Sequence, residues 1–216
     1  MTGGCEMAEI EKTLVHVSGP CRYPEERRAA GEIAEALEKG GFQVYLPSRD
    51  GIDSCFPVVA GDRGVGEWAI PGAVRARFAL EMFQVLERCD CLVFNMNGRV
   101  PDEGGLFEAA GAFCAGKPLV IYKRDHRSVF YGKDNSMITG LTADFSTVGD
   151  TGGIFSELAG LIRDAGPASG GYVAPPHVRR VVRQGERVWR LMSDARYLEA
   201  GDVERIRLLS AEIVEP

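Results

Sequence analysis

The chain has 216 residues, of which 45% are hydrophobic and 26% charged, enough for one globular domain with a core and a smaller appended segment. A net charge of -6 without a long basic block argues against a nucleic acid polymer as partner, because neutralising phosphates needs clustered Lys and Arg. No apolar run approaches the ~20 residues of a membrane span, and the acidic N-terminus lacks the apolar stretch of a secretion signal. We therefore expect a cytoplasmic protein without a membrane partner.

The cysteines indicate neither a disulfide framework nor a metal site. Cys89, Cys91 and Cys114 stand among apolar residues of predicted strands and helices, so we expect buried free thiols. The Cys89-x-Cys91 spacing is not that of a metal site, and no histidine lies nearby. We predict no metal and no cofactor.

The first half of the chain predicts a βαβ unit. Residues 1–12 are expected to form a tail, and residues 13–18 a buried strand that ends at Gly19-Pro20. A helix should begin near Pro24, where proline suits the first helical position, and a second strand should cover residues 44–46. This pattern implies parallel strands joined by a right-handed crossover. The predicted apolar stripe of the helix is Ala29, Ile33, Ala36 and Leu37.

His16 lies inside the first predicted strand, and we interpret it as a packed core residue rather than a catalytic one. Residues 50–71 are rich in Gly and Pro and form a long segment of the kind that is usually functional. Phe56 and Trp68 in this segment suit an apolar plug that anchors it. A helix over residues 73–88 should follow.

The middle of the chain predicts a second strand–loop–helix–strand unit. Residues 92–94 form an apolar run, Asn97-Gly98 and Pro101 break the chain, a helix should cover 103–115, and 119–122 should form a buried strand. The predicted fold is therefore a flavodoxin- or Rossmann-like open parallel sheet flanked by helices. Such sheets bind ligands in the loops at the carboxyl ends of their strands.

The predicted helix over residues 103–115 has two different faces. We expect its bulky residues to enter a core: Leu106, Phe107, Ala110, Phe113 and Cys114. Glu108 shares the other face with small residues, which would let a flat ligand or another backbone approach: Gly104, Gly111, Ala112 and Ala115. With Asp102 at the helix entrance, Glu108 could do nucleophilic and acid/base work. An N-cap aspartate and a solvated glutamate explain the same pattern.

The stretch from Pro101 to Asp125 resembles the signature of the nucleoside 2-deoxyribosyltransferase family, with an acid, a glycine pair, a glutamate, a small-residue helix and a GKP turn. Residues 17–20, 44–51 and 135–140 resemble the family's first strand and loop, its second strand and loop, and its late Asn-x-Met motif. The four motifs stand in the family's order over residues 13–142.

The resemblance implies an enzyme that transfers 2-deoxyribose between nucleobases. Glu108 would be the nucleophile that forms a covalent deoxyribosyl ester, and Asp102 would bind and help protonate the leaving base. Ser18 or Tyr23 would orient the nucleophile. The substrate-binding residues that the resemblance implies are Ser18, Gly19, Tyr23, Asp50, Gly104, Asn135 and Met137.

The implied partners are a small-molecule nucleoside and a nucleobase. The resemblance also implies a homodimer or larger homo-oligomer with shared active sites. Asn135 of a neighbouring subunit would bond the sugar 5′-hydroxyl, and Met137 would pack on the ligand.

One departure from the family pattern leaves other functions open. Many relatives have an aspartate at the position of Met82, and the neighbouring Glu81 is offset by about 100° around a helix. A nucleoside or nucleoside 5′-monophosphate N-hydrolase with the same nucleophile is one alternative, and a non-catalytic nucleotide-binding module is another. Asn135 favours nucleosides as substrates, since monophosphate-cleaving relatives tend to carry serine there. His126 or Arg127 could contact a phosphate, so a nucleotide substrate stays possible.

The rest of the chain is expected to extend and append to this domain. Lys123, Arg124 and Arg127 are interpreted as a solvated face. An amphipathic helix over 152–164 completes a domain of residues 13–165, followed by a linker over 166–175 and a helical appendage over 176–216.

Two helices are predicted in this appendage, over residues 178–191 and 203–213. The first carries four basic residues in an acidic protein: Arg179, Arg180, Arg183 and Arg187. A packed appendage is the simplest interpretation, and a regulatory or anion-binding role is the other.

Overall fold

The computed structural model describes residues 10–52, 73–128, 134–165 and 172–194. The chain divides into two compact units: Met1–Leu46 with Cys89–Tyr172, and Pro47–Arg88 with Val173–Pro216. Several predicted features lie outside the described residues: most of the N-terminal tail, Phe56, Trp68, much of the linker and the helix over 203–213.

The first unit is built on a four-stranded parallel sheet. Its strands are β1 (Leu14–Ser18), β2 (Gln43–Tyr45), β3 (Cys91–Asn95) and β4 (Leu119–Tyr122), in the order β2-β1-β3-β4. The predicted open parallel α/β fold is confirmed, and each strand lies within one residue of its predicted bounds. The order reverses between β1 and β3, so the loops after these two strands flank a switch point where open sheets bind ligands.

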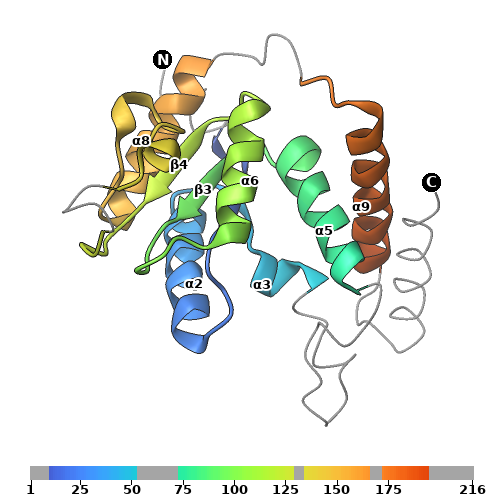
Figure 1. The fold of residues 1–216 in the computed structure, drawn as a ribbon, viewed down its shortest axis with the longest axis horizontal. Coiled ribbons are helices and arrows are strands. Elements are labelled where there is room, and N and C mark those ends of the chain that lie inside the picture. The colour runs from blue at the N-terminus through green and yellow to red at the C-terminus, as the bar shows by residue number, and fades with distance from the viewer. Residues whose placement is uncertain (1–9, 53–72, 129–133, 166–171, 195–216) are drawn as a thin grey trace. The chain divides into compact units, whose positions relative to one another are not determined.

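Helices cover both faces of this sheet. The helices in the described part of the unit are α2 (Pro24–Lys39), α6 (Glu103–Cys114), α7 (Ser136–Thr139) and α8 (Thr151–Ala165), and a 3-10 turn lies at Ala143–Phe145. Helices α2 and α8 contact each other and the sheet, while α6 packs against β1, β3 and β4 (Figure 1).

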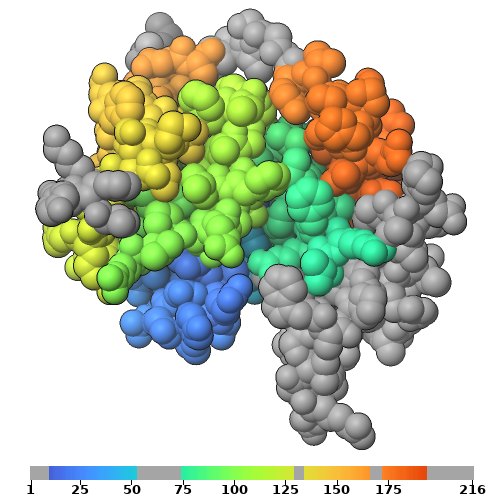
Figure 2. Space-filling view, in the orientation of Figure 1, coloured from blue at the N-terminus to red at the C-terminus, as the bar shows by residue number. Residues whose placement is uncertain are grey.

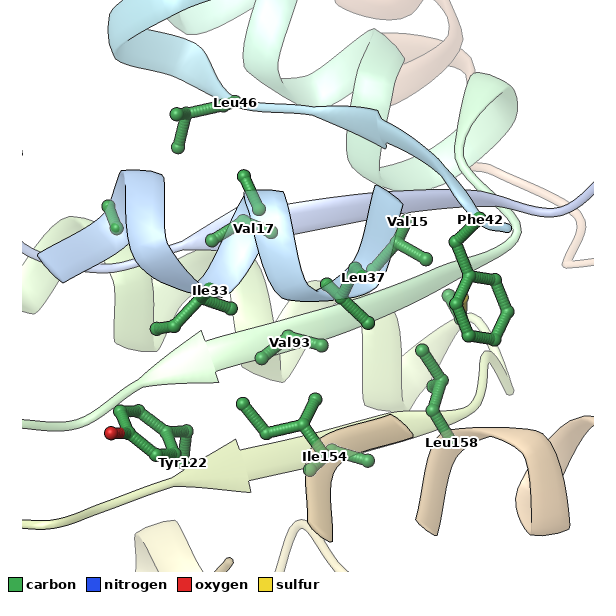
Figure 3. Close-up of a cluster of buried hydrophobic side chains, with 14 of the residues drawn as sticks. Val15, Val17, Ile33, Leu37, Phe42, Leu46, Val93, Tyr122, Ile154 and Leu158 are labelled. Atoms are coloured by element: carbon green, nitrogen blue, oxygen red, sulfur yellow. The ribbon is translucent and has the colours of Figure 1, made fainter. Parts of the chain in front are cut away.

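The apolar core lies under α2 and α8. Alternate strand residues point towards these helices, and Val15, Val17 and Val93 meet Ile33 from α2 and Leu158 from α8 (Figure 3). Because side chains alternate along a strand, the intervening residues of β1 and β3 point to the face that α6 covers.

The buried stripe of α2 differs from the predicted one. Ala30, Ile33, Ala34 and Leu37 are its buried residues, which is the i, i+3, i+4, i+7 set of one helix face. Ile33 and Leu37 were predicted correctly. Ala29 and Ala36 were wrongly included in the stripe and are only partly buried, because each lies one position off this face.

The second unit is helical. It comprises α3 (Pro47–Asp50), α5 (Ala73–Phe83), a π-helix (Gln84–Arg88) and α9 (Pro176–Asp194). The helix predicted over residues 73–88 therefore exists, but its last turn is a π-helix. Among the described helices, none is both long and apolar enough to span a bilayer.

The cysteine prediction is only partly right. Cys89 and Cys91 are buried free thiols as expected, whereas Cys114 is a free thiol that lies exposed at the end of α6. Burial raises the pKa of the Cys91 thiol well above its usual value, with a smaller contribution from the nearby Asp90 carboxylate. Cys91 therefore stays protonated and unreactive near neutral pH.

Candidate active site

The end of β1 and the start of α6 approach each other through two glycines. Gly19 has φ +132°, and a Cβ there would lie 2.5 Å from the Asn95 carbonyl oxygen. A Cβ on Gly105 would lie 2.8 Å from both Gly19 Cα and the Phe94 ring. Only glycine fits at either position, so the small residues allow α6 to sit directly on the sheet's switch point.

This contact overturns the predicted orientation of α6. Its buried residues are the small ones, Gly105, Ala109 and Ala112, while Phe107 and Phe113 are 55% and 52% exposed. The outer side of the helix lies at the molecular surface (Figure 2). Close backbone packing against the sheet requires small side chains, so the bulky face turns outward.

Glu108 lies on α6 one turn after this contact. Its Oε2 atom accepts a hydrogen bond from Ser18 Oγ at 2.5 Å and lies 3.2 Å from His16 Nε2. The Glu108 side chain is 17% exposed, so it stays accessible to a small ligand. The predicted association of Ser18 with Glu108 is therefore present in this geometry.

His16 is a packed core residue, as predicted, but its contact with Glu108 was not predicted. It is fully buried, as a core histidine would be, and its ring lies 5.2 Å from the ring of Tyr45. However, it also contacts the Glu108 carboxylate. The available signal was strand alternation, because His16 and Ser18 stand two residues apart and so share the face towards α6.

Asp102 caps the N-terminus of α6. Its Oδ1 atom accepts a hydrogen bond from the Gly105 backbone N–H at 2.7 Å. The cap interpretation from the sequence therefore applies. Six residues of helix place Asp102 about 9 Å from Glu108 along the axis of α6. The Asp102 carboxylate thus lies at the start of the helix, between one and two turns before Glu108.

The loops after β3 and β4 are tied together by side chains. Asn95 Oδ1 accepts hydrogen bonds from the backbone N–H and the side chain of Asn97. Asn97 Oδ1 in turn accepts from the backbone N–H groups of Arg124 and Asp125, at 2.8 and 2.9 Å. This network fixes the loop that leads into Asp102 and the adjoining loop after β4.

The predicted solvated face after β4 is right for Arg124 and Arg127, which are exposed, and wrong for Lys123. Lys123 is only 8% exposed and pairs with Asp134. The Arg127 guanidinium forms hydrogen bonds with Asp125, and these bonds, with the Arg127 backbone N–H, hold the pKa of the Asp125 carboxyl well below its usual range. Arg127 thus has an intramolecular carboxylate partner.

The other predicted site residues are spread over the described structure. Tyr23 precedes α2 and is 56% exposed, with its backbone N–H donating to Glu26. Asn135 caps α7, and Met137 is 80% exposed. Gly104 is exposed beside Asp102. None of these side chains has a described contact with Glu108.

Asp50, a predicted substrate-binding residue, lies in the second unit, as do Met82, which departs from the family pattern, and its neighbour Glu81. Asp50 ends α3 and pairs with Arg49. In α5, Glu81 is buried and Met82 is partly buried. The two side chains thus differ in exposure, as their angular offset on a helix predicts.

A comparison with protein-family models identifies the family of this chain. The family model described as nucleoside 2-deoxyribosyltransferase matches residues 15–165, more than half of the chain. The chain belongs to the nucleoside 2-deoxyribosyltransferase family. The resemblance predicted from the four motifs is confirmed. Membership supports an enzyme of the deoxyribosyltransferase or N-hydrolase type that acts on small nucleosides and nucleobases.

One solved structure shares the fold of this chain at low sequence identity. A conserved protein from Enterococcus faecalis V583 is 17% identical, with a TM-score of 0.52 over 69% of this chain and 99% of that one. A 2-desoxiribosyltransferase from Leishmania mexicana is also 17% identical, with a TM-score of 0.43 over 68% of this chain and 97% of that one. No curated protein sequence matches the chain.

Proposed function

We propose that this protein transfers 2-deoxyribose between nucleobases through a covalent ester on Glu108. The observation that supports this most is the position of the Glu108 carboxylate, held by Ser18 and His16 at the switch point of a parallel sheet. A carboxylate held there with partial exposure is suited to attack an anomeric carbon.

The reaction has two displacements at C1′. In the first, a Glu108 oxygen bonds to C1′ while the C1′–N bond breaks, and its electron pair leaves with the base, which gains a proton. In the second, a nitrogen of the acceptor base attacks C1′, the ester C1′–O bond breaks, and the acceptor loses its proton. Both pass through a sugar with oxocarbenium character, which a neighbouring carboxylate stabilises.

Ser18 and His16 act on the same oxygen of Glu108. The Ser18 hydroxyl donates a hydrogen bond to Oε2, and the buried imidazole borders that oxygen on the strand side. These contacts fix the rotamer of Glu108, so the oxygen that attacks C1′ is presented in one orientation. Ser18 and His16 are therefore positioning residues in the proposed mechanism.

Asp102 takes the leaving base in this proposal. One carboxylate oxygen is engaged by the Gly105 N–H, and the other has no hydrogen-bond partner within the described part of the chain. That second oxygen can contact a ring nitrogen of the base and carry the proton that the base gains and the acceptor returns.

Asn135 and Met137 fit the proposed sharing of sites between subunits. Both are exposed on α7, and neither has a described contact with Glu108 of its own subunit. We assign them to the sugar end of a neighbour's pocket in a homodimer or larger homo-oligomer.

The test of this function is chromatography of the purified protein with deoxyadenosine and free cytosine, and then without cytosine. We expect deoxycytidine and adenine in the first mixture. Release of adenine with no deoxycytidine would show an N-hydrolase. The absence of turnover with deoxynucleosides and with 5′-monophosphates would show a binding module.

The variant Asp102→Asn distinguishes the helix-capping role of Asp102 from its proposed role in proton transfer. Asparagine caps helices about as well as aspartate but cannot carry a proton. We expect the melting temperature to stay near that of the wild type while kcat falls roughly 100-fold. Asp102→Ala should additionally lose about 1 kcal/mol of stability with the cap. Retention of full kcat by Asp102→Asn would remove Asp102 from the proposed mechanism.

A further inference from the structure

Helix α9 of the second unit carries a strongly basic surface. Four exposed arginines, called here the arginine face, lie on one side of the helix: Arg179, Arg180, Arg183 and Arg187. With Pro176 and Gln184 they line a cavity of about 520 Å³. This surface is unusual in a chain whose net charge is -6.

The packing of α9 against α5 fixes the direction of the arginine face. A Cβ on Gly185 would lie 1.9 Å from the Ala79 carbonyl oxygen, so the two helix backbones are in direct contact. Val182 and Val188 are buried on the same side. The Arg88 guanidinium lies 4.0 Å from the centroid of the Trp189 ring, a cation–π contact. These contacts prevent rotation of α9, so the arginines stay outward.

The arginine face concentrates positive charge. Arg179, Arg183 and Arg187 are spaced four residues apart, about 6 Å along the helix axis. Within the described ranges, neither Arg179 nor Arg183 has an ion pair with a carboxylate, whereas Arg190 on the same helix pairs with Glu186 at 2.5 Å. Like charges at this spacing repel each other, so a bound anion would relieve the repulsion.

Gln184 adds a polar group to the same cavity. Its Oε1 atom is buried and has no hydrogen-bond partner among the residues described. Buried polar atoms are nearly always hydrogen-bonded in folded proteins, so this amide favours a ligand that supplies a partner. A carboxamide can present either its oxygen or its NH₂ group to such a ligand.

We propose that the arginine face and Gln184 form a second site, which binds a nucleoside triphosphate by its phosphates. Guanidinium groups bind phosphate oxygens in a bidentate manner, and several of them match a chain of linked phosphates. The cavity has the volume of sites for ligands of nucleotide size. The overall negative charge of the protein disfavours a long polynucleotide as the occupant. This site uses none of the residues assigned to deoxyribosyl transfer.

The test measures binding of ATP, inorganic tripolyphosphate and adenosine to the full-length protein by isothermal titration calorimetry. We expect saturable binding of ATP and tripolyphosphate and none of adenosine at the same concentration. Arg179→Gln/Arg183→Gln should weaken binding at least tenfold. Arg28→Gln/Arg190→Gln removes the same charge from exposed arginines that have carboxylate partners, and it should change the affinity for ATP less than twofold. Arg183→Lys keeps the positive charge but loses the bidentate guanidinium, so its affinity for ATP should lie between those of the wild type and the double variant.

Several outcomes would overturn the proposal. They are the absence of saturable ATP and tripolyphosphate binding, equal weakening in both double variants, and loss of binding in Glu108→Gln, which would place the ligand at the transfer site. Tighter binding of a single-stranded oligonucleotide than of ATP would identify a polymer partner instead. If the double variant fails to fold, the single variants Arg179→Gln and Arg183→Gln are measured instead. We expect each to weaken ATP binding at least threefold, and unchanged binding in both would overturn the proposal.

Discussion

Replacing Glu108 with glutamine should lower kcat for deoxyribosyl transfer by roughly a thousandfold or more, while the protein stays folded. Glutamine has nearly the same shape but no anionic oxygen with which to attack C1′. The amide can still accept a hydrogen bond from the Ser18 hydroxyl, so the packing around it should persist. The measurement is the initial rate of deoxycytidine formation from deoxyadenosine and cytosine.

Glu103→Gln is the matched control for this prediction. Glu103 is an exposed glutamate in the first turn of the same helix, so the substitution removes the same charge away from the Ser18 contact. We expect kcat within about twofold of the wild type, with a loss of stability of about 0.5 kcal/mol from the helix dipole. Similar losses of kcat in both variants would show an effect of charge on α6, not of a nucleophile.

Gly105→Ala should destabilise the protein by about 1–3 kcal/mol and lower kcat as well. The added Cβ would lie 2.8 Å from both Gly19 Cα and the Phe94 ring, so α6 must move away from β1 and β3. That movement lengthens the distance between Glu108 and Ser18, which are held on these two elements. Denaturant unfolding gives the stability change, and the transfer assay gives the change in kcat.

Gly31→Ala tests whether steric contact is the cause. Gly31 also lies in a helix, α2, but a Cβ there meets nothing within 4 Å. The same substitution should therefore stabilise the protein by about 0.5–1 kcal/mol through helix propensity, with kcat unchanged. If Gly105→Ala also stabilised the protein, the close approach of α6 to the sheet would be wrong.

The sheet was predictable because its strands carry strong local signals. The apolar runs at Leu92-Val93-Phe94 and over residues 119–122 are bounded by turn residues, and a buried parallel strand needs apolar residues on both faces. Helix-forming segments between these runs imply the crossovers. Sequence pattern therefore decides the fold class and most element boundaries of the first unit.

The orientation of α6 was not predictable from the same kind of pattern. Hydrophobicity placed Phe107 and Phe113 inward, although both are more than half exposed. The deciding factor is the distance between backbones, since Gly105 permits a contact with Gly19 that any larger side chain would prevent. This partner lies 86 residues away in the sequence, so local periodicity carries no information about it.

In the candidate site, too, some features were predictable from the sequence and others depend on long-range packing. Glu108 and Asp102 were proposed from their spacing and the family motif, and Ser18 from the resemblance of the stretch that ends the first strand. His16 was correctly predicted as a core residue, but its contact with Glu108 was not, because only the packing of α6 brings the two side chains together. The apposition of α9 and α5 likewise depends on Gly185, whose partner Ala79 is distant in sequence.

The most direct test of the central claim is a search for the deoxyribosyl ester itself. The protein would be mixed with deoxyadenosine alone, quenched in acid within the first turnover, digested, and analysed by tandem mass spectrometry. We predict a mass increase of one deoxyribosyl group on the peptide containing Glu108, which disappears when cytosine is added before the quench. Turnover with no adduct, or an adduct located on another residue, would contradict the assignment of Glu108 as the nucleophile.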